Sequence, residues 1–123
     1  MTEPDQTLQD AMQVIVGEQL SSVTFVMDYW QLAFDGHGFS IMTWLAVGAD
    51  DWTTRSGEDG FTDRLCKQIT KIVSAASFAD KVLTITFEDG SIIRAFARDE
   101  DYRPPCPEAL LFQSYKFKTL YVV

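Results

Sequence analysis

Hydrophobic positions near the N-terminus repeat with the period of an α-helix. A T-x-x-D pattern at Thr7 and Asp10 is typical of a helix start. The apolar residues that follow stand three or four positions apart and share one helical face: Leu8, Ala11, Met12 and Ile15. Gly17 then favours termination. This pattern predicts a helix over residues 7–16.

The period then changes to that of β-strands. Residues 20–27 are rich in β-branched and apolar side chains, and residues 29–34 alternate between two faces. Two glycines within residues 35–38 allow the positive φ of a tight turn, so residues 39–44 are expected to return as a third strand. Residues 48–60 are polar and lack a period, which predicts the main loop.

The second half repeats this order. Apolar residues four positions apart begin at Phe61 and predict a shorter helix. Three strands are then expected over residues 69–75, 81–87 and 91–98, with a turn at residues 88–90. The chain therefore contains two successive units of one helix and three strands.

The two units also resemble each other in sequence. Residues 17–23 align with residues 66–72, and residues 32–36 align with residues 85–90 if the second turn has one additional residue. This matched order predicts one domain, residues 1–123, with two repeat units and a C-terminal extension at about 7–47, 60–98 and 99–123.

The C-terminal extension has a different character. Prolines exclude regular structure from residues 99–107, and the last of them suits the first position of a short helix over residues 107–112. Residues 115–123 alternate and predict a final strand. Lys116 and Lys118 would suit an edge position there, because charge discourages pairing with another molecule.

These elements predict an α+β fold. Short hairpins and one-sided alternation require an antiparallel sheet of about six or seven strands, with two helices packed on one face. In this arrangement the helix-β-β-β unit occurs twice. A partly closed β-barrel with flanking helices has the same pattern, and the sequence does not separate the two arrangements.

Composition narrows the expected partners. The chain has 123 residues, 46% of them hydrophobic, and a formal net charge of −8, so clustered bases for nucleic acid are not expected. Residues 1–60 contain ten acidic residues and one basic residue, whereas residues 61–123 contain eight and nine. We therefore expect a basic protein partner to contact the first half.

The N-terminal residues do not resemble a secretory signal, because they are acidic and lack an apolar run. No stretch reaches the roughly 18 apolar residues that span a bilayer. We expect a cytoplasmic protein that does not contact a membrane. In that compartment Cys66 and Cys106 are expected to be free thiols.

Motifs for catalysis or cofactor binding are absent from the sequence. The chain has no P-loop, dinucleotide-binding glycine pattern, nucleophile elbow or zinc-ligand spacing. His37 is the only histidine, and its glycine-rich turn predicts a solvated side chain. Neighbouring acids such as Asp50 and Asp51 do not follow the order of a calcium-binding loop. We therefore expect no enzymatic activity, no cofactor and no metal.

Aromatic residues beside acids are typical of a protein-binding surface, because Trp and Tyr bury anchor area while acids steer a basic partner. The candidates occupy an outward strand position or polar loops: Tyr29, Asp50, Asp51, Trp52 and Tyr102. The leading hypothesis is a non-enzymatic interaction protein, of an inhibitor or immunity type, that uses this acidic surface.

Three alternatives stay open. A small-molecule-binding domain would have a pocket between helices and sheet, lined by Met12, Met42, Trp30 and Trp44. An enzyme would need the loop carboxylates to converge in a cleft. A homodimer would form if the acidic unit of one copy packed with the neutral unit of another, either head to tail or about a two-fold axis.

The run from Phe25 to Gly36 is similar to a pattern in small bacterial proteins of unknown function. The same is true of residues 63–66 and 107–109, and of the second strand set that ends in Phe-x-Asp-Gly. The resemblance covers most of the chain and is carried by turn glycines, strand aromatics and helix starts. It implies a bacterial protein of that fold and implies no activity.

Overall fold

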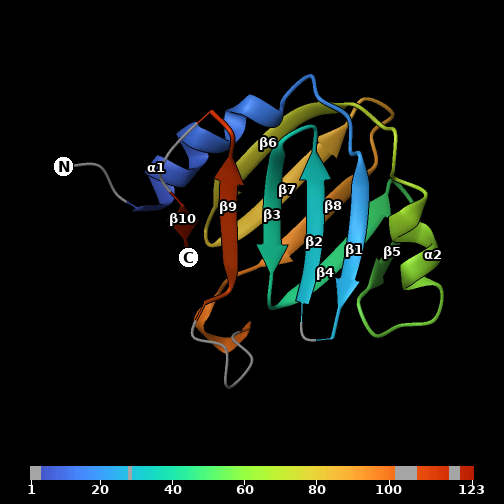
Figure 1. Ribbon diagram of the computed structural model, residues 1–123. Coiled ribbons are helices and arrows are strands. Elements are labelled where there is room, and N and C mark those ends of the chain that lie inside the picture. The colour runs from blue at the N-terminus through green and yellow to red at the C-terminus, as the bar shows by residue number, and fades with distance from the viewer. Residues whose placement is uncertain (1–3, 28, 102–107, 117–119) are drawn as a thin grey trace.

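The computed structural model describes residues 4–27, 29–101, 108–116 and 120–123. They form two antiparallel sheets of five strands each, in the orders β1-β2-β3-β9-β10 and β5-β4-β8-β7-β6 (Figure 1). The first sheet contains β1 Ser22–Val26, β2 Tyr29–Phe34, β3 His37–Ile41, β9 Leu110–Ser114 and β10 Tyr121–Val122. The second contains β4 Trp44–Ala49, β5 Trp52–Arg55, β6 Val73–Ala79, β7 Val82–Phe87 and β8 Ile92–Phe96. The helical segments are α1 Pro4–Ala11, η1 Met12–Ile15, α2 Phe61–Cys66 and η2 Asp99–Asp101.

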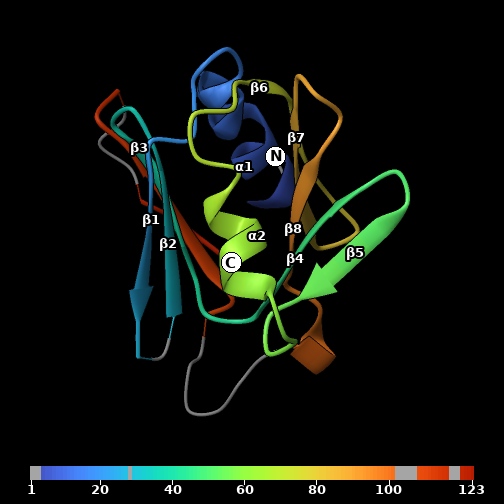
Figure 2. The ribbon, with the colours of Figure 1, turned by 90° about the vertical axis from the view of Figure 1, so that its right-hand side faces the viewer.

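The two sheets face each other as two layers, and the helices α1 and α2 lie at opposite sides of the space between them (Figures 1 and 2). Alternate residues of β3 and β7 are buried, as expected for strands with one face on a core. Both sheets supply large side chains to this core. Those with almost no exposed surface include Phe34, Phe39, Phe87 and Phe112.

The predicted α+β class and antiparallel pairing are confirmed, but the prediction of one sheet with six or seven strands is wrong. The described chain forms two open sheets with end strands, so the partly closed barrel is wrong as well. Each strand set has one apolar face. Helices of eight and six residues cover too little of such a face, and the two sheets remove more apolar area from water by covering each other.

The predicted loop over residues 48–60 contains the strand β5. Only Thr54 of its four residues is buried, so its sequence lacks the apolar alternation by which strands are recognised. Its pairing with β4 depends on Gly48, because a Cβ atom there would lie 2.8 Å from the carbonyl oxygen of Trp52.

The C-terminal extension also differs from the prediction. The expected helix over residues 107–112 is wrong, because residues 110–114 form β9 and pair with β3. Of the strand expected over residues 115–123, the described part confirms Tyr121–Val122, and Lys116 lies in a turn before it. Lys118 lies outside the described residues.

The two halves of the chain have the same order of elements. The first half runs α1-β1-β2-β3 and then β4-β5, and the second runs α2-β6-β7-β8 and then β9-β10. Each set of three strands is extended by the hairpin that follows the other set, since β9 pairs with β3 and β4 pairs with β8. The halves therefore cannot separate without breaking both sheets.

Equivalent positions in the two halves are 53 residues apart. Val26 pairs with Tyr29 and Ala79 pairs with Val82, so both members of the pair shift by 53 (79 minus 26, 82 minus 29). The same shift equates the buried helix residues of the two halves. These are Leu8 with Phe61 and Met12 with Leu65.

A local two-fold axis relates the halves at the segments before β1 and β6. Gln19 and Ile72 are equivalent by the same shift and form an isolated bridge with each other. The four backbone hydrogen bonds around this bridge form two equivalent pairs. They run from Leu20 N–H to Lys71 C=O (3.0 Å), Val73 N–H to Glu18 C=O (2.9 Å), Gly17 N–H to Val73 C=O (2.9 Å) and Thr70 N–H to Leu20 C=O (2.8 Å).

The residues that start these segments share an unusual backbone conformation. Gly17 has φ +91° and its equivalent, Thr70, has φ +84°. The sequence alignment places residue 17 with residue 66, whereas the structure places residue 17 with residue 70. The alignment of residues 17–23 with 66–72 is therefore displaced by four positions (70 minus 66). Matched positions of this kind are what an internal repeat would produce, and the duplication itself stays a prediction.

Candidate functional site

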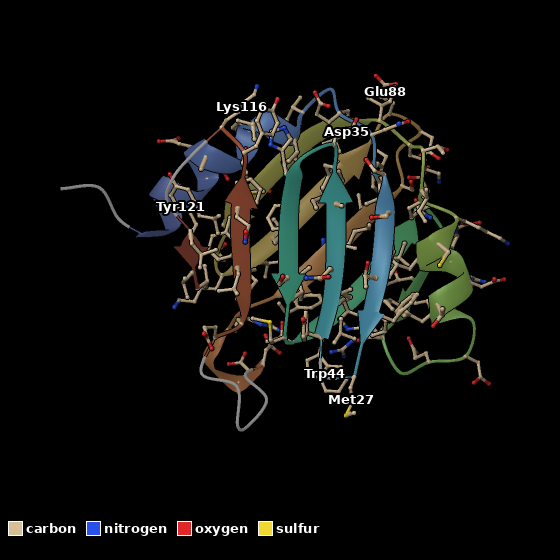
Figure 3. The ribbon with its side chains drawn as sticks, viewed as in Figure 1. Met27, Asp35, Trp44, Glu88, Lys116 and Tyr121 are labelled. Atoms are coloured by element: carbon tan, nitrogen blue, oxygen red, sulfur yellow. The ribbon has the colours of Figure 1, made fainter. Side chains whose placement is uncertain are left out.

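The strand β1 has an open edge. It is an end strand of the first sheet, so within the described residues it pairs with β2 alone. Four of its five residues are exposed. Phe25 is 44% exposed, and Met27, which follows the strand and is labelled in Figure 3, is 96% exposed. Large apolar side chains therefore lie beside an unpaired strand edge.

The equivalence between the halves shows which backbone groups face outward. In an antiparallel strand, successive residues direct their N–H and C=O groups to opposite sides. Val23 and Phe25 are equivalent to Ala76 and Phe78, whose backbone groups point away from β7 and toward α1. Val23 and Phe25 therefore direct their N–H and C=O groups away from β2.

The corresponding edge of β6 is closed by two glutamines. Gln13 Nε2 donates a hydrogen bond to the Ala76 carbonyl at 2.9 Å, and Gln9 Nε2 donates to the same oxygen at 3.5 Å. The Phe78 N–H donates to Gln9 Oε1 at 2.6 Å. The elements α1 and η1 lie directly against β6. The outward Ala76 carbonyl and Phe78 N–H are thus satisfied inside the molecule.

Two side chains account for the difference between the edges. The shift of 53 places Thr62 and Cys66 where the first helix has Gln9 and Gln13 (62 minus 9, 66 minus 13). Thr and Cys end one heavy atom beyond Cβ, so they cannot reach a strand edge as Gln does. In addition, α2 lies against β4 and β5. At these two positions the second helix therefore has no side chain long enough to close the edge of β1.

The sequence of β1 also lacks the usual protection of an edge strand. Natural edges carry charged residues, prolines or bulges that discourage pairing. Residues 19–27 contain no charged residue and no proline, in a chain of net charge −8. Sequence reasoning missed β1 as a candidate site, and this uncharged run of β-branched and apolar residues is the signal that identifies it.

Three of the proposed partner-binding residues lie together at the β4–β5 hairpin. Asp50 and Asp51 form its turn, and Trp52 begins β5. The guanidinium of Arg64 lies 4.5 Å from the centre of the Trp52 ring, a distance typical of a cation–π contact. Trp52 is also half-buried against the core. Its ring is therefore engaged within the molecule.

The remaining two proposed residues do not join this group. Tyr29 begins β2, at the end of the first sheet where the β1–β2 hairpin turns, and Figures 1 and 2 place that end away from the β4–β5 turn. Tyr102 lies outside the described residues. The described residues thus do not form one acidic surface with clustered aromatics.

A cleft of about 360 Å³ lies between α2 and β5. It is lined by Asp51, Trp52, Arg64, Lys67, Gln68 and Lys71. Three of these six residues are basic, so the surface beside Asp51 and Trp52 is of mixed charge and not acidic. Anions are favoured beside clustered Lys and Arg side chains.

Part of this positive charge is neutralised locally. Lys71 Nζ lies 2.7 Å from Asp89 Oδ2. This hydrogen bond and those from the Ser91 hydroxyl and N–H lower the pKa of Asp89 to about 2. The Ser91 hydroxyl oxygen also lies 2.8 Å from Oε1 of the buried Gln68. Arg64 and Lys67 are therefore the cations that the cleft could offer to an anion.

His37 is buried, so the prediction of a solvated turn histidine is wrong. It is 2% exposed because it belongs to β3 and pairs with Ser114 of β9. Its Nδ1 lies 2.6 Å from Ser114 Oγ, and its ring stacks on Tyr115 with centres 5.2 Å apart. Burial lowers the pKa of His37 below its ordinary value of 6.5, so the imidazole is neutral at pH 7.

This pair has the polarity of a nucleophile and base. The Lys116 N–H donates to Ser114 Oγ at 3.1 Å, and the same oxygen lies within hydrogen-bond distance of His37 Nδ1, as in a nucleophile–base pair. However, Ser114 is only 6% exposed. A substrate carbonyl would not reach it, so we assign the pair to packing between β3 and β9.

The residues proposed to line a small-molecule pocket are used in packing at separate places. Met12 has no exposed surface and Met42 is buried. Trp30 packs edge-on between Phe25 and Phe61, with ring centres 5.0 and 5.4 Å apart. Trp44 lines a different cleft. It shares that cleft with Arg55, Ser56 and Glu58.

Among the described residues, no three His, Cys, Asp or Glu side chains are placed so that they could hold a metal ion. The helices of the described segments are too short and too polar to cross a membrane. The described residues define a two-sheet α+β protein in which the end strand β1 has an open edge. Comparison of the chain with protein-family models, curated proteins and solved structures found no match.

Proposed function

We propose that the protein is a non-enzymatic interaction protein that binds an extended polypeptide as an added strand beside β1. The observation that carries this proposal is the contrast between the open edge of β1 and the closed edge of β6. Strand addition obtains affinity from backbone hydrogen bonds, which Val23 and Phe25 offer. Specificity would come from side chains that pack beside Phe25 and Val26, both partly exposed.

The charge distribution supports a basic partner. Residues 1–60 contain ten acidic residues and one basic residue, and this part of the chain includes β1. Acids near an uncharged strand would speed the approach of a segment with basic flanks, while the strand itself accepts apolar residues. An inhibitor or immunity-type role would follow if the bound segment belonged to the partner's working surface.

A peptide selection tests the proposal. A library of displayed peptides would be selected on the wild-type protein, and an enriched peptide would then be synthesised. Thr24→Lys places a charge on the open edge, and Ser77→Lys places the same charge at the equivalent exposed position of β6. We expect Thr24→Lys to weaken binding at least about tenfold and Ser77→Lys to leave it unchanged.

The selected peptide should also protect the Val23 and Phe25 amides from hydrogen exchange, and added salt should weaken its binding. Enriched peptides that bind both lysine variants equally well would show that the site is not β1, and the proposal would fall.

The cleft between α2 and β5 favours a second candidate function, which is binding of a small organic anion. Arg64 and Lys67 would pair with a carboxylate or phosphate, and the Trp52 ring would contact its apolar part. Titration with benzoate and with inorganic phosphate, followed by amide NMR shifts, tests this candidate. Saturable shifts at Lys67 that Lys67→Ala removes and Lys81→Ala preserves would support it. Shifts that rise linearly with ligand would exclude it.

A further inference from the structure

The sheets of the described chain have four end strands, and three of them are protected against pairing. The edge of β6 is closed by Gln9 and Gln13. The strand β10 has two residues, which offer few backbone groups. The strand β5 has four residues and includes Arg55. An end strand that is both short and charged is a poor template. Only β1 combines five residues, exposure and absence of charge.

The electrostatics of the chain single out β1 as the place where two copies can meet. Two molecules of net charge −8 repel each other over most of their surfaces. Residues 19–27 carry no charge, so contact through this segment avoids placing like charges opposite each other. Contact at β1 also covers Phe25, Val26 and Met27, which are 44%, 38% and 96% exposed.

The strand is complementary to itself in an antiparallel register. A two-fold axis through Thr24 would place Val23 opposite Phe25 of the second copy. Because these two residues direct their backbone groups outward, each such pair would exchange two hydrogen bonds, and the axis would generate two pairs. Thr24 would face Thr24 of the second copy in the close pair at the centre. The apolar Val23 and Phe25 side chains would then lie side by side across the junction.

We infer that, in the absence of a partner, the β1 strands of two copies pair with each other in this register. The β1-β2-β3-β9-β10 sheet of one copy and that of the other then form one continuous sheet of ten strands. This inference rests on the proposed function, because a partner strand would occupy the same edge and displace the second copy. Self-pairing thus holds the binding site closed until a partner competes for it. Repulsion between the acidic molecules keeps the pairing weak enough for that exchange.

Salt distinguishes the two kinds of pairing. Added salt screens the repulsion between two acidic copies and should strengthen self-pairing, whereas it should weaken binding of a basic peptide. Sedimentation or light scattering after size exclusion, over a range of protein and salt concentrations, measures the first effect. We expect a concentration-dependent dimer for the wild type and for Ser77→Lys. Thr24→Lys should weaken dimerisation at least about tenfold, because it places two ammonium groups opposite each other.

The outcomes separate the inference from the proposed function. A wild-type protein that stays monomeric at all concentrations, or a dimer insensitive to Thr24→Lys, would overturn self-pairing. Selected peptides could still bind β1 in either case, and the function would stand. A Thr24→Lys protein with unchanged circular dichroism and unfolding midpoint excludes misfolding as the cause of a lost dimer. Phe25→Lys provides a second variant at the same edge.

Discussion

The strands β1 and β6 occupy equivalent places in the two halves and differ in what their outer edges can do. Each starts a three-stranded set and follows a helix that packs two large side chains into the core. One edge is closed by glutamine side chains, and the other is open. The comparison shows that the two halves repeat their core contacts while the outer edges of their first strands differ, and we attribute the difference to two helix positions.

The largest effect on stability is expected at the core contacts of the two helices. Met12 and Leu65 are equivalent and fully buried. Replacing either with Ala should lower the free energy of unfolding by about 2–5 kcal/mol, because each leaves a cavity. Urea unfolding measures this loss, and Val16→Ala, at an exposed position, is the control. A loss below about 1 kcal/mol at one position only would show that the helices are not equivalent in packing.

Opening the edge of β6 should have the next largest effect. Gln9→Ala combined with Gln13→Ala removes the side chains that bond Ala76 and Phe78. We expect a loss of about 1–3 kcal/mol, since buried backbone groups lose their partners. The variant should also form assemblies larger than a dimer, because each molecule then has two open edges. Light scattering identifies those assemblies, and an unchanged size would contradict the role given to the glutamines.

The paired turns before β1 and β6 predict opposite effects of glycine. Thr70 has φ +84°, a conformation that strains a β-branched residue, so Thr70→Gly should stabilise the protein by about 1 kcal/mol. Gly17→Ala, at φ +91°, should destabilise it by about 1 kcal/mol. Thermal unfolding measures both changes. Two changes of the same sign would mean that the positions are not related as the local axis requires.

The first hairpin turn leads into a titratable residue and the second does not. Phe34 pairs with His37, whereas the Phe87 N–H donates to the Ser91 carbonyl. Because the pKa of His37 is lowered in the folded protein, the unfolded chain binds a proton more readily. The contribution of His37 to the free energy of unfolding should therefore be fully present above pH 6.5 and be lost as the pH decreases below it. His37→Gln should reduce this slope between pH 7.5 and 5.5, and an unchanged slope would contradict the assignment.

The smallest change in stability is expected when the glutamines that close the edge of β6 are introduced at the equivalent positions of α2. Thr62→Gln combined with Cys66→Gln gives α2 the side chains that close β6. The free energy of unfolding should change by less than about 1 kcal/mol, while the protein should become monomeric and lose peptide binding at β1. Thr62→Asn combined with Cys66→Ser is the control with side chains too short to reach. Equal dimerisation of both variants would show that α2 is not placed to act as α1 does.

Much of the local structure could be predicted from the sequence, because its signals are local. The helix at residues 7–16 and the strand at residues 29–34 follow from the periods of apolar residues, and α1-η1 and β2 confirm both within a few positions. The strands β5 and β9 were missed because their pairing partners determine them. Thr54 alone is buried in β5, and β9 follows a proline that resembles a helix start.

The sites were harder to predict, because sites depend on which distant residues meet. Asp51 and Trp52 lie beside Arg64 of α2 and the lysines that follow this helix, which changes the charge expected there from acidic to mixed. His37 is buried because β9 pairs with β3 across 77 positions. The uncharged run of residues 19–27 is a sequence signal for β1, but the contrast with the closed edge of β6 depends on glutamines that lie more than 60 positions from the residues of that strand to which they bond.

The most direct measurement is hydrogen exchange at two equivalent amides, Phe25 and Phe78, as a function of protein concentration. The Phe78 N–H is bonded to Gln9 within the molecule, so its protection should not depend on concentration. The Phe25 N–H faces outward from an open edge, so it should exchange rapidly in dilute solution and become protected as copies pair. Equal, concentration-independent protection of both amides would contradict the account, because it would mean that the edge of β1 is already closed.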